Sequence, residues 1–78
     1  MNLYLISNVV NGGYDTYDSA VVAAENPLSA QASHPSGCDE YNNYDYSWCN
    51  IQDVVVTLLG KAKAGTKAGV ICASFNAG

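Results

Sequence analysis

The chain has 78 residues, a net charge of −4, and no arginine beside its three lysines. This length predicts a single domain over residues 1–78 with a small core, and an apolar content of 49% argues against a disordered chain. So few basic residues argue against direct nucleic-acid binding, because phosphate contacts need Lys and Arg. No stretch is long and apolar enough to predict a membrane span.

Two strands are predicted in the first third of the chain. Residues 3–10 are rich in β-branched and apolar side chains and stop at the turn sequence NGG. Residues 19–24, SAVVAA, predict a second strand, which the preceding YDTYD either extends or joins as a loop. We expect the two strands to pair as an antiparallel hairpin.

A short helix is predicted after the second strand. Asn26 suits the N-cap, and Pro27 falls at the first helical position, where its fixed φ does no harm. Leu28 and Ala32, four residues apart, are expected to face the sheet. Pro35 predicts that the helix ends by His34, after about two turns.

The second half of the chain predicts a long loop and two more strands. Residues 35–50 show no period and are expected to be irregular. Residues 51–59, IQDVVVTLL, carry the strongest strand signal. Val54, Val56 and Leu58 alternate along it with Val55, Thr57 and Leu59, so one of these two sets is expected to face the helix. Residues 60–69 hold all three lysines in a turn, and residues 70–75 form the last strand. The predicted fold class is α+β, in the order ββαββ, with a mainly antiparallel four-stranded sheet and one short helix on one face.

The three cysteines are predicted to be reduced thiols. Cys72 lies in an apolar strand pattern and is expected in the core, while a bridge between Cys38 and Cys49 stays open as an alternative. The N-terminus lacks the features of a signal peptide, which predicts a cytoplasmic protein. The odd cysteine count and a reducing cytoplasm argue against the bridge.

Catalytic and metal sites are weakly supported. His34 is the only histidine, and nothing in the sequence fixes a nucleophile and an orienting group beside it. A metal site built from His34, Cys38 and Cys49 lacks the closely spaced ligand pairs of zinc sites. We therefore predict no enzyme, no cofactor and no metal.

Acids and aromatic rings are concentrated in two segments, YDTYD and DEYNNYDYSWC. Every acid lies between Asp15 and Asp53, and every lysine between Lys61 and Lys67. Aromatic rings supply contact area at interfaces, and one acidic zone suits a basic partner. The alternative for each of these residues, taken singly, is a structural role in which the tyrosines cover the sheet edge and the aspartates keep the loop soluble. The predicted partner-binding residues are Tyr14, Asp15, Tyr17, Asp18, Asp39, Glu40, Tyr44, Asp45, Tyr46 and Trp48.

Four segments resemble a family of small proteins from phages and mobile elements of bacteria, some of which are anti-CRISPR inhibitors. They are YDTYDSAVVAAE (14–25), HPSG (34–37), VVVTLLGKAKAGTKAGVI (54–71) and ASFNAG (73–78). The resemblance implies a stoichiometric, non-catalytic inhibitor of a type I system, with type I-C as the first candidate. It would act in the bacterial host cytoplasm, bind the surveillance complex or its large subunit, and block recognition of target DNA.

The expected partner is thus a host protein with a basic DNA-binding groove, which a monomer of this chain would occupy. Two other readings stay open. One is an unrelated interaction module that targets another host protein, such as a polymerase or nuclease. The other is a small hydrolase built around His34.

Overall fold

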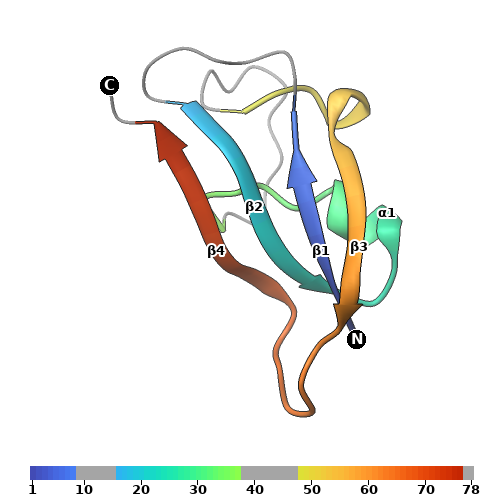
Figure 1. Cartoon of the computed structure of the whole chain (residues 1–78). Coiled ribbons are helices and arrows are strands. Elements are labelled where there is room, and N and C mark those ends of the chain that lie inside the picture. Colours follow the sequence, from blue (N-terminus) through green and yellow to red (C-terminus); the bar gives the residue numbers. More distant parts are fainter. Residues whose placement is uncertain (9–15, 38–47, 77–78) are drawn as a thin grey trace.

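The computed structural model describes residues 1–8, 16–37 and 48–76. Its elements are β1 (Asn2–Ser7), β2 (Thr16–Ala24), α1 (Pro27–Gln31), the 3-10 turn η1 (Ile51–Asp53), β3 (Val55–Lys61) and β4 (Gly69–Asn76). The strands form one antiparallel sheet in the order β3-β1-β2-β4 (Figure 1). This confirms the predicted α+β fold with four strands and one short helix.

The sheet is built around the hairpin of β1 and β2. Leu5 lies opposite Val21 in this pair, and the register is unbroken from Asn2 to Ser7. β3 and β4 follow each other in sequence but occupy opposite edges of the sheet (Figure 1). Residues 62–68 connect them past the start of β1 and the end of β2, so this segment is a crossing connection rather than a tight hairpin turn.

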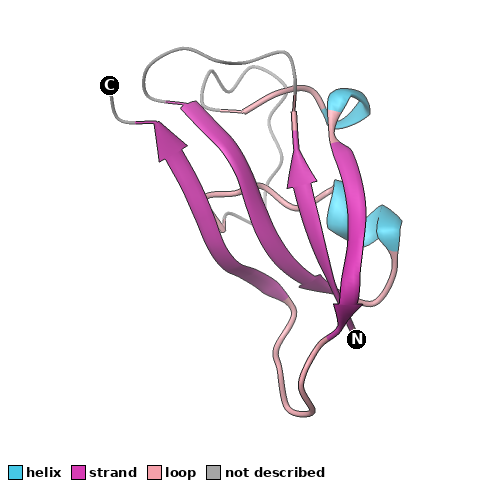
Figure 2. Cartoon of the chain, viewed as in Figure 1, coloured by secondary structure: helices cyan, strands magenta, loops and turns pink. Residues whose placement is uncertain are grey.

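The two faces of the sheet differ in what covers them. Side chains alternate along a strand, and the register places Tyr4, Ile6, Ala20 and Val22 on one face. All four are buried. Helix α1 and the segment that follows it lie against this face, behind the sheet in the view of Figure 2. The opposite face points toward the viewer and is not covered by any of the described elements.

Helix α1 begins as predicted. The Asn26 side-chain oxygen accepts a hydrogen bond from the Ser29 backbone N–H at 2.9 Å, and Pro27 is the first helical residue. The buried face of the helix was predicted wrongly, because Leu28 is 76% exposed and Ala32 is also exposed. Ala30 faces the sheet instead. Each helical residue is rotated by about 100° from the one before it, so two residues differ by about 200°. Ala30 therefore points roughly opposite to Leu28 and Ala32.

Replacing Asn26 by alanine is expected to lower the free energy of unfolding by about 1 kcal/mol, because the Ser29 N–H loses its cap. Asn26→Ser is the matched control, since a serine hydroxyl can accept the same hydrogen bond. Urea denaturation followed by circular dichroism measures both variants. Equal stability of the alanine and serine variants would contradict a stabilising cap.

The strand predicted over residues 51–59 begins later than expected. Residues 51–53 form η1, in which the Asp53 N–H donates to the Asn50 carbonyl at 2.9 Å. The Gln31 side-chain amide donates to the Ile51 carbonyl at 2.9 Å and ties η1 to α1. Within the strand signal, Val54 is buried and Val56 packs on the core, but Leu58 on the same face is 61% exposed.

The other boundaries shift in a similar way. β1 ends at Ser7 rather than at residue 10, and residues 9–10 lie outside the described part of the chain. β2 begins at Thr16, so the YDTYD segment extends the strand over its last three residues. β4 covers Gly69–Asn76 and thus contains the predicted strand 70–75.

Candidate functional site

Three of the ten predicted partner-binding residues fall in the described part of the chain: Tyr17, Asp18 and Trp48. The other seven lie outside the described residues, namely Tyr14, Asp15, Asp39, Glu40, Tyr44, Asp45 and Tyr46. The geometry of the site is therefore built from the three described positions and their neighbours.

Asp18 sits on a bulge near the start of β2. Tyr17 lies opposite Phe75 and Ser19 lies opposite Ser74, so Asp18 is the extra residue between two pairs. Its side chain is exposed, and its carboxylate accepts a hydrogen bond from the Ser74 hydroxyl at 3.4 Å. Bulges re-aim side chains at the ends of sheets. Here the bulge presents to solvent the only charged side chain of β2.

Tyr17, next to this acid, lies in a small aromatic cluster. Its ring centroid is 4.8 Å from that of Phe75 and 6.0 Å from that of His34, which it meets edge-on. Tyr17 is half-buried, whereas Phe75 is 47% exposed. Phe75 was not among the predicted site residues. Its position could not be read from its own segment, because only the register of β4 against β2 brings it beside Tyr17.

Trp48 was expected to supply contact area to a partner, and the structure places it in the core instead. It is 2% exposed and packs in one cluster with Ile6 and Val22. Many other members of the cluster are small, such as Ala20 and Ala30. One large ring therefore fills the space between the sheet and α1, and Trp48 has no surface left to offer.

Described charges gather at opposite ends of the sheet. Asp18 and Asp53 lie where β2 and β3 begin, which we call the acidic end. The lysines lie at Lys61 and in the crossing connection, at the other end of β3. Glu25, after the end of β2, is an acid on the lysine side. Six residue steps along β3 separate the ends by roughly 20 Å, which exceeds the screening length of about 10 Å at 0.1 M salt.

The HPSG segment forms a turn, and its His34 side chain is not exposed as a catalytic base would be. The Gly37 N–H donates to the His34 carbonyl at 2.9 Å, and Gly37 has a φ of +83°. The His34 ring is 4% exposed; its Nδ1 accepts from the Ser36 backbone N–H at 3.1 Å and lies 2.7 Å from the Ser36 hydroxyl. Nδ1 thus closes the turn over Ser36, so we assign this motif a structural role.

The described thiols do not form a ligand set. Cys49 is buried in the core cluster. Cys72 is free and exposed, not buried as expected, because β4 is an edge strand. Cys38 lies outside the described residues. Among the residues that the structure describes, no group of three His, Cys, Asp or Glu side chains could hold a metal ion.

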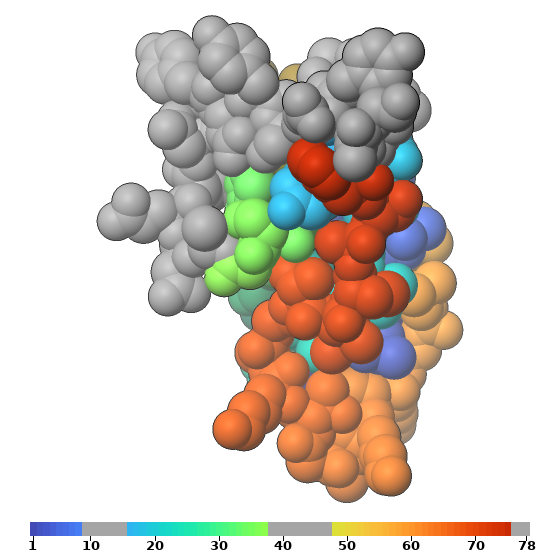
Figure 3. All heavy atoms as spheres, turned by 90° about the vertical axis from the view of Figure 1, so that its left-hand side faces the viewer, coloured from blue at the N-terminus to red at the C-terminus, as the bar shows by residue number. Residues whose placement is uncertain are grey.

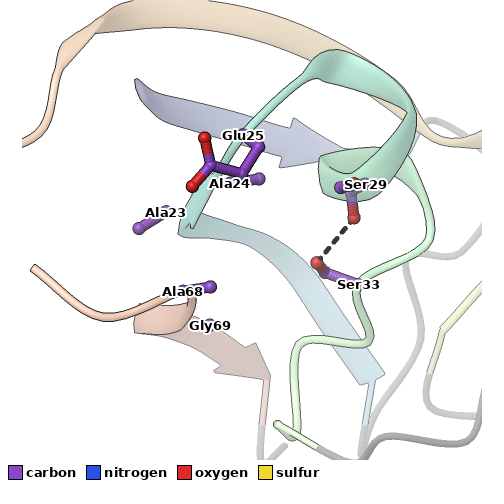
Figure 4. Close-up of a pocket in the computed structure, with 7 residues that line it drawn as sticks. All are labelled: Ala23, Ala24, Glu25, Ser29, Ser33, Ala68 and Gly69. Atoms are coloured by element: carbon purple, nitrogen blue, oxygen red, sulfur yellow. Dashed lines mark hydrogen bonds between the residues drawn. The ribbon is translucent and has the colours of Figure 1, made fainter. Parts of the chain in front are cut away.

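A hollow of about 290 Å³ lies between the end of β2, α1 and the start of β4 (Figure 4). The Ser33 hydroxyl donates to the Ser29 carbonyl across part of it, at 3.0 Å. Glu25 is its one ionisable side chain, so the lining contains no pair of groups for acid–base chemistry. The lining residues are Ala23, Ala24, Glu25, Ser29, Ser33, Ala68 and Gly69.

No protein-family model, curated protein or solved structure matches the chain. In the part of the chain that the structure describes, neither α1 nor η1 has the length and apolar run needed to cross a membrane.

Proposed function

We propose that this protein is a non-catalytic inhibitor that binds a basic, DNA-binding groove of a host protein through its acidic end. The observation that carries the proposal is the position of Asp18. This acid is exposed beside the Tyr17–Phe75 aromatic pair and stands at the end of the sheet opposite the lysines. The site thus combines negative charge with flat rings, as a nucleic acid does.

The physical basis is electrostatic attraction followed by contact of aromatic side chains. A groove that binds DNA carries Lys and Arg, which attract an acidic surface and orient it during encounter. Separation of the two charged ends by more than a screening length lets the acidic end act without cancellation by the lysines. Phe75, half-exposed beside Tyr17, supplies apolar area that charge alone does not.

The proposed target is a type I CRISPR effector in the bacterial cytoplasm, with the surveillance complex or its large subunit as the bound species. This part of the proposal is supported by the resemblance of the four quoted segments to small phage and mobile-element proteins. Binding there blocks recognition of target DNA and requires no cofactor and no catalytic residue.

A plasmid-interference assay in a host with an active type I-C system tests the proposal. Expression of the protein is expected to restore transformation by a targeted plasmid, and the purified surveillance complex is expected to retain the protein and lose affinity for target DNA. An expression vector with a stop codon early in the gene serves as the control. Undiminished interference, together with unchanged DNA binding by the purified complex, would contradict the CRISPR target.

Pull-down from a host lysate separates the general proposal from the specific one. Recovery of a different DNA-binding protein through its basic groove would keep the inhibitor and replace the target. Recovery of a partner without a basic groove would contradict the mode of binding itself.

A further inference from the structure

The outer edge of β4, which we call the β4 edge, pairs with no described strand. β4 is the last strand in the order β3-β1-β2-β4, and its ladder to β2 uses one side of its backbone only. Among the described residues, no hydrogen bond outside that ladder reaches a backbone group of residues 70–75. Figure 3, turned so that this edge faces the viewer, shows atoms of β4 at the surface along most of the strand. The β4 edge therefore presents backbone donors and acceptors to solvent.

The sequence of β4 does little to protect this edge. Proteins usually protect an outer strand with charged side chains, proline, a bulge or a covering element. The strand GVICASFN contains no charged residue and no proline. The bulge on β4 itself lies at Ile71, so the edge is continuous over residues 72–76. β3, the other outer strand, ends in Lys61 and packs against α1. Of the two outer strands, β4 is the one that is open to a further strand.

The side chains of β4 that face the core side of the sheet are also incompletely covered. Ala73 lies opposite the buried Ala20 but is exposed, and Phe75, opposite Tyr17, is 47% exposed. Helix α1 packs against β1, β2 and β3, so β4 lies at the margin of the layer that α1 provides. Side chains alternate along a strand. A strand added beside β4 would thus place every second side chain against Phe75 and Ala73, where apolar groups fit.

Asp18 gives the edge a preference for positive charge. The Ser74 hydroxyl donates to the Asp18 carboxylate at 3.4 Å, which holds this acid toward β4 on the side of the sheet opposite to Phe75. A residue of an added strand opposite Ser74 lies on this same side, about 4.8 Å beyond β4. The long side chain of an arginine or lysine at that position reaches past Ser74 to the carboxylate. The net charge of −4 also favours a basic segment over a second copy of the chain.

We propose that the β4 edge binds an extended, basic segment of the partner protein by strand addition. The segment pairs with residues 72–76 through its backbone, and it places apolar side chains beside Phe75 and a basic side chain beside Asp18. Main-chain hydrogen bonds supply the affinity in this mode of binding, and the alternate side chains supply the specificity. The inference rests on the proposed function for the basic character of the partner. It adds the element that is recognised, a strand at the rim of the groove.

A synthetic peptide tests the β4 edge without any host protein. The probe is a fluorescein-labelled peptide in which valine alternates with arginine. Its control is the same peptide with every backbone nitrogen methylated, which keeps the side chains and charges but has no N–H to donate. Fluorescence anisotropy is expected to show at least about tenfold tighter binding of the unmethylated peptide, since each lost hydrogen bond weakens binding by roughly two- to tenfold.

Two protein variants test the contribution of charge to peptide binding. Asp18→Asn removes the charge beside the edge, and Glu25→Gln removes an exposed charge after the other end of β2. Asp18→Asn is expected to weaken binding of the unmethylated peptide by roughly two- to fivefold, as loss of one exposed ion pair does. Glu25→Gln is expected to leave it unchanged. Equal effects of the two variants would contradict a basic side chain beside Asp18.

Amide hydrogen exchange measured by NMR locates the contact. In the free protein, alternate amides of residues 72–76 are expected to exchange quickly, because they point away from β2. The unmethylated peptide is expected to slow them and to leave the amides of β3 unchanged. Absence of binding, equal binding of the two peptides, slowing confined to β3, or slow exchange of every amide in 72–76 without peptide would each overturn strand addition. A negative plasmid-interference assay, in contrast, contradicts the CRISPR target and not the β4 edge.

Discussion

Replacing Trp48 by alanine is expected to lower the free energy of unfolding by about 3–5 kcal/mol. Trp48 is 2% exposed and is one of the largest side chains in the core cluster. The neighbouring alanines are too small to fill the cavity that remains. A domain of this size has a total stability near the lower end of about 5–15 kcal/mol. The variant is therefore expected to be largely unfolded at physiological temperature.

Urea denaturation followed by far-ultraviolet circular dichroism measures this effect. Fluorescence does not serve, because Trp48 is the only tryptophan in the chain. Leu28→Ala is the control, since it also removes a large apolar side chain but from an exposed position, and its expected change is within about 0.5 kcal/mol. Similar stability of the two variants would show that Trp48 is not a core residue in solution.

Reversal of four acids to lysine is expected to abolish inhibition without unfolding the domain. The four positions are Asp15, Asp18, Asp39 and Glu40, of which Asp18 is the one that the structure describes. The change reverses the sign of the net charge and turns attraction to a basic groove into repulsion. A single Asp18→Ala change is expected to have little effect, because one exposed pair contributes about 0.2–1 kcal/mol.

Charge reversal of the lysines is the matched control. Changing Lys61, Lys63 and Lys67 to glutamate alters a similar number of charges but leaves the acidic end intact, so inhibition is expected to persist. The affinity of the wild type is also expected to fall as salt concentration rises. Inhibition that survives the acid reversal, with binding insensitive to salt, would reduce the acids to solvated surface groups.

Local sequence signals predicted the fold well where the residues that determine an element all lie within that element. Asn26 and Pro27 specify the start of α1 by themselves, because a cap and a fixed φ act within one turn. The apolar segments around Leu5 and Val21 likewise predicted two strands. The ends of a strand were harder to predict. The start of the predicted third strand is η1 instead, because the backbone N–H groups of Asp53 and Val54 donate to the carbonyls of Asn50 and Ile51 and close a tight turn.

Burial was predicted poorly where it depends on distant neighbours. Cys72 has a core-like sequence environment, yet its strand lies at an edge, and strand order is not encoded in any one strand. Trp48 lies in a polar, acidic segment, yet its side chain packs in the core cluster on the covered face of the sheet. The same limit explains why Phe75 escaped notice as a neighbour of Tyr17, since the two are joined only by sheet register.

The connection of residues 62–68 across the end of the sheet leaves β3 and β4 to pair with strands that lie far back in the sequence. In the described sheet, β3 pairs with β1 and β4 pairs with β2, while β3 and β4 do not touch each other. Each late strand therefore needs one strand of the first hairpin as its partner, β1 for β3 and β2 for β4. The β4 pairing joins Thr16 to Asn76, and contacts between such distant positions form slowly. During synthesis, β2 therefore keeps an unpaired edge until β4 has left the ribosome.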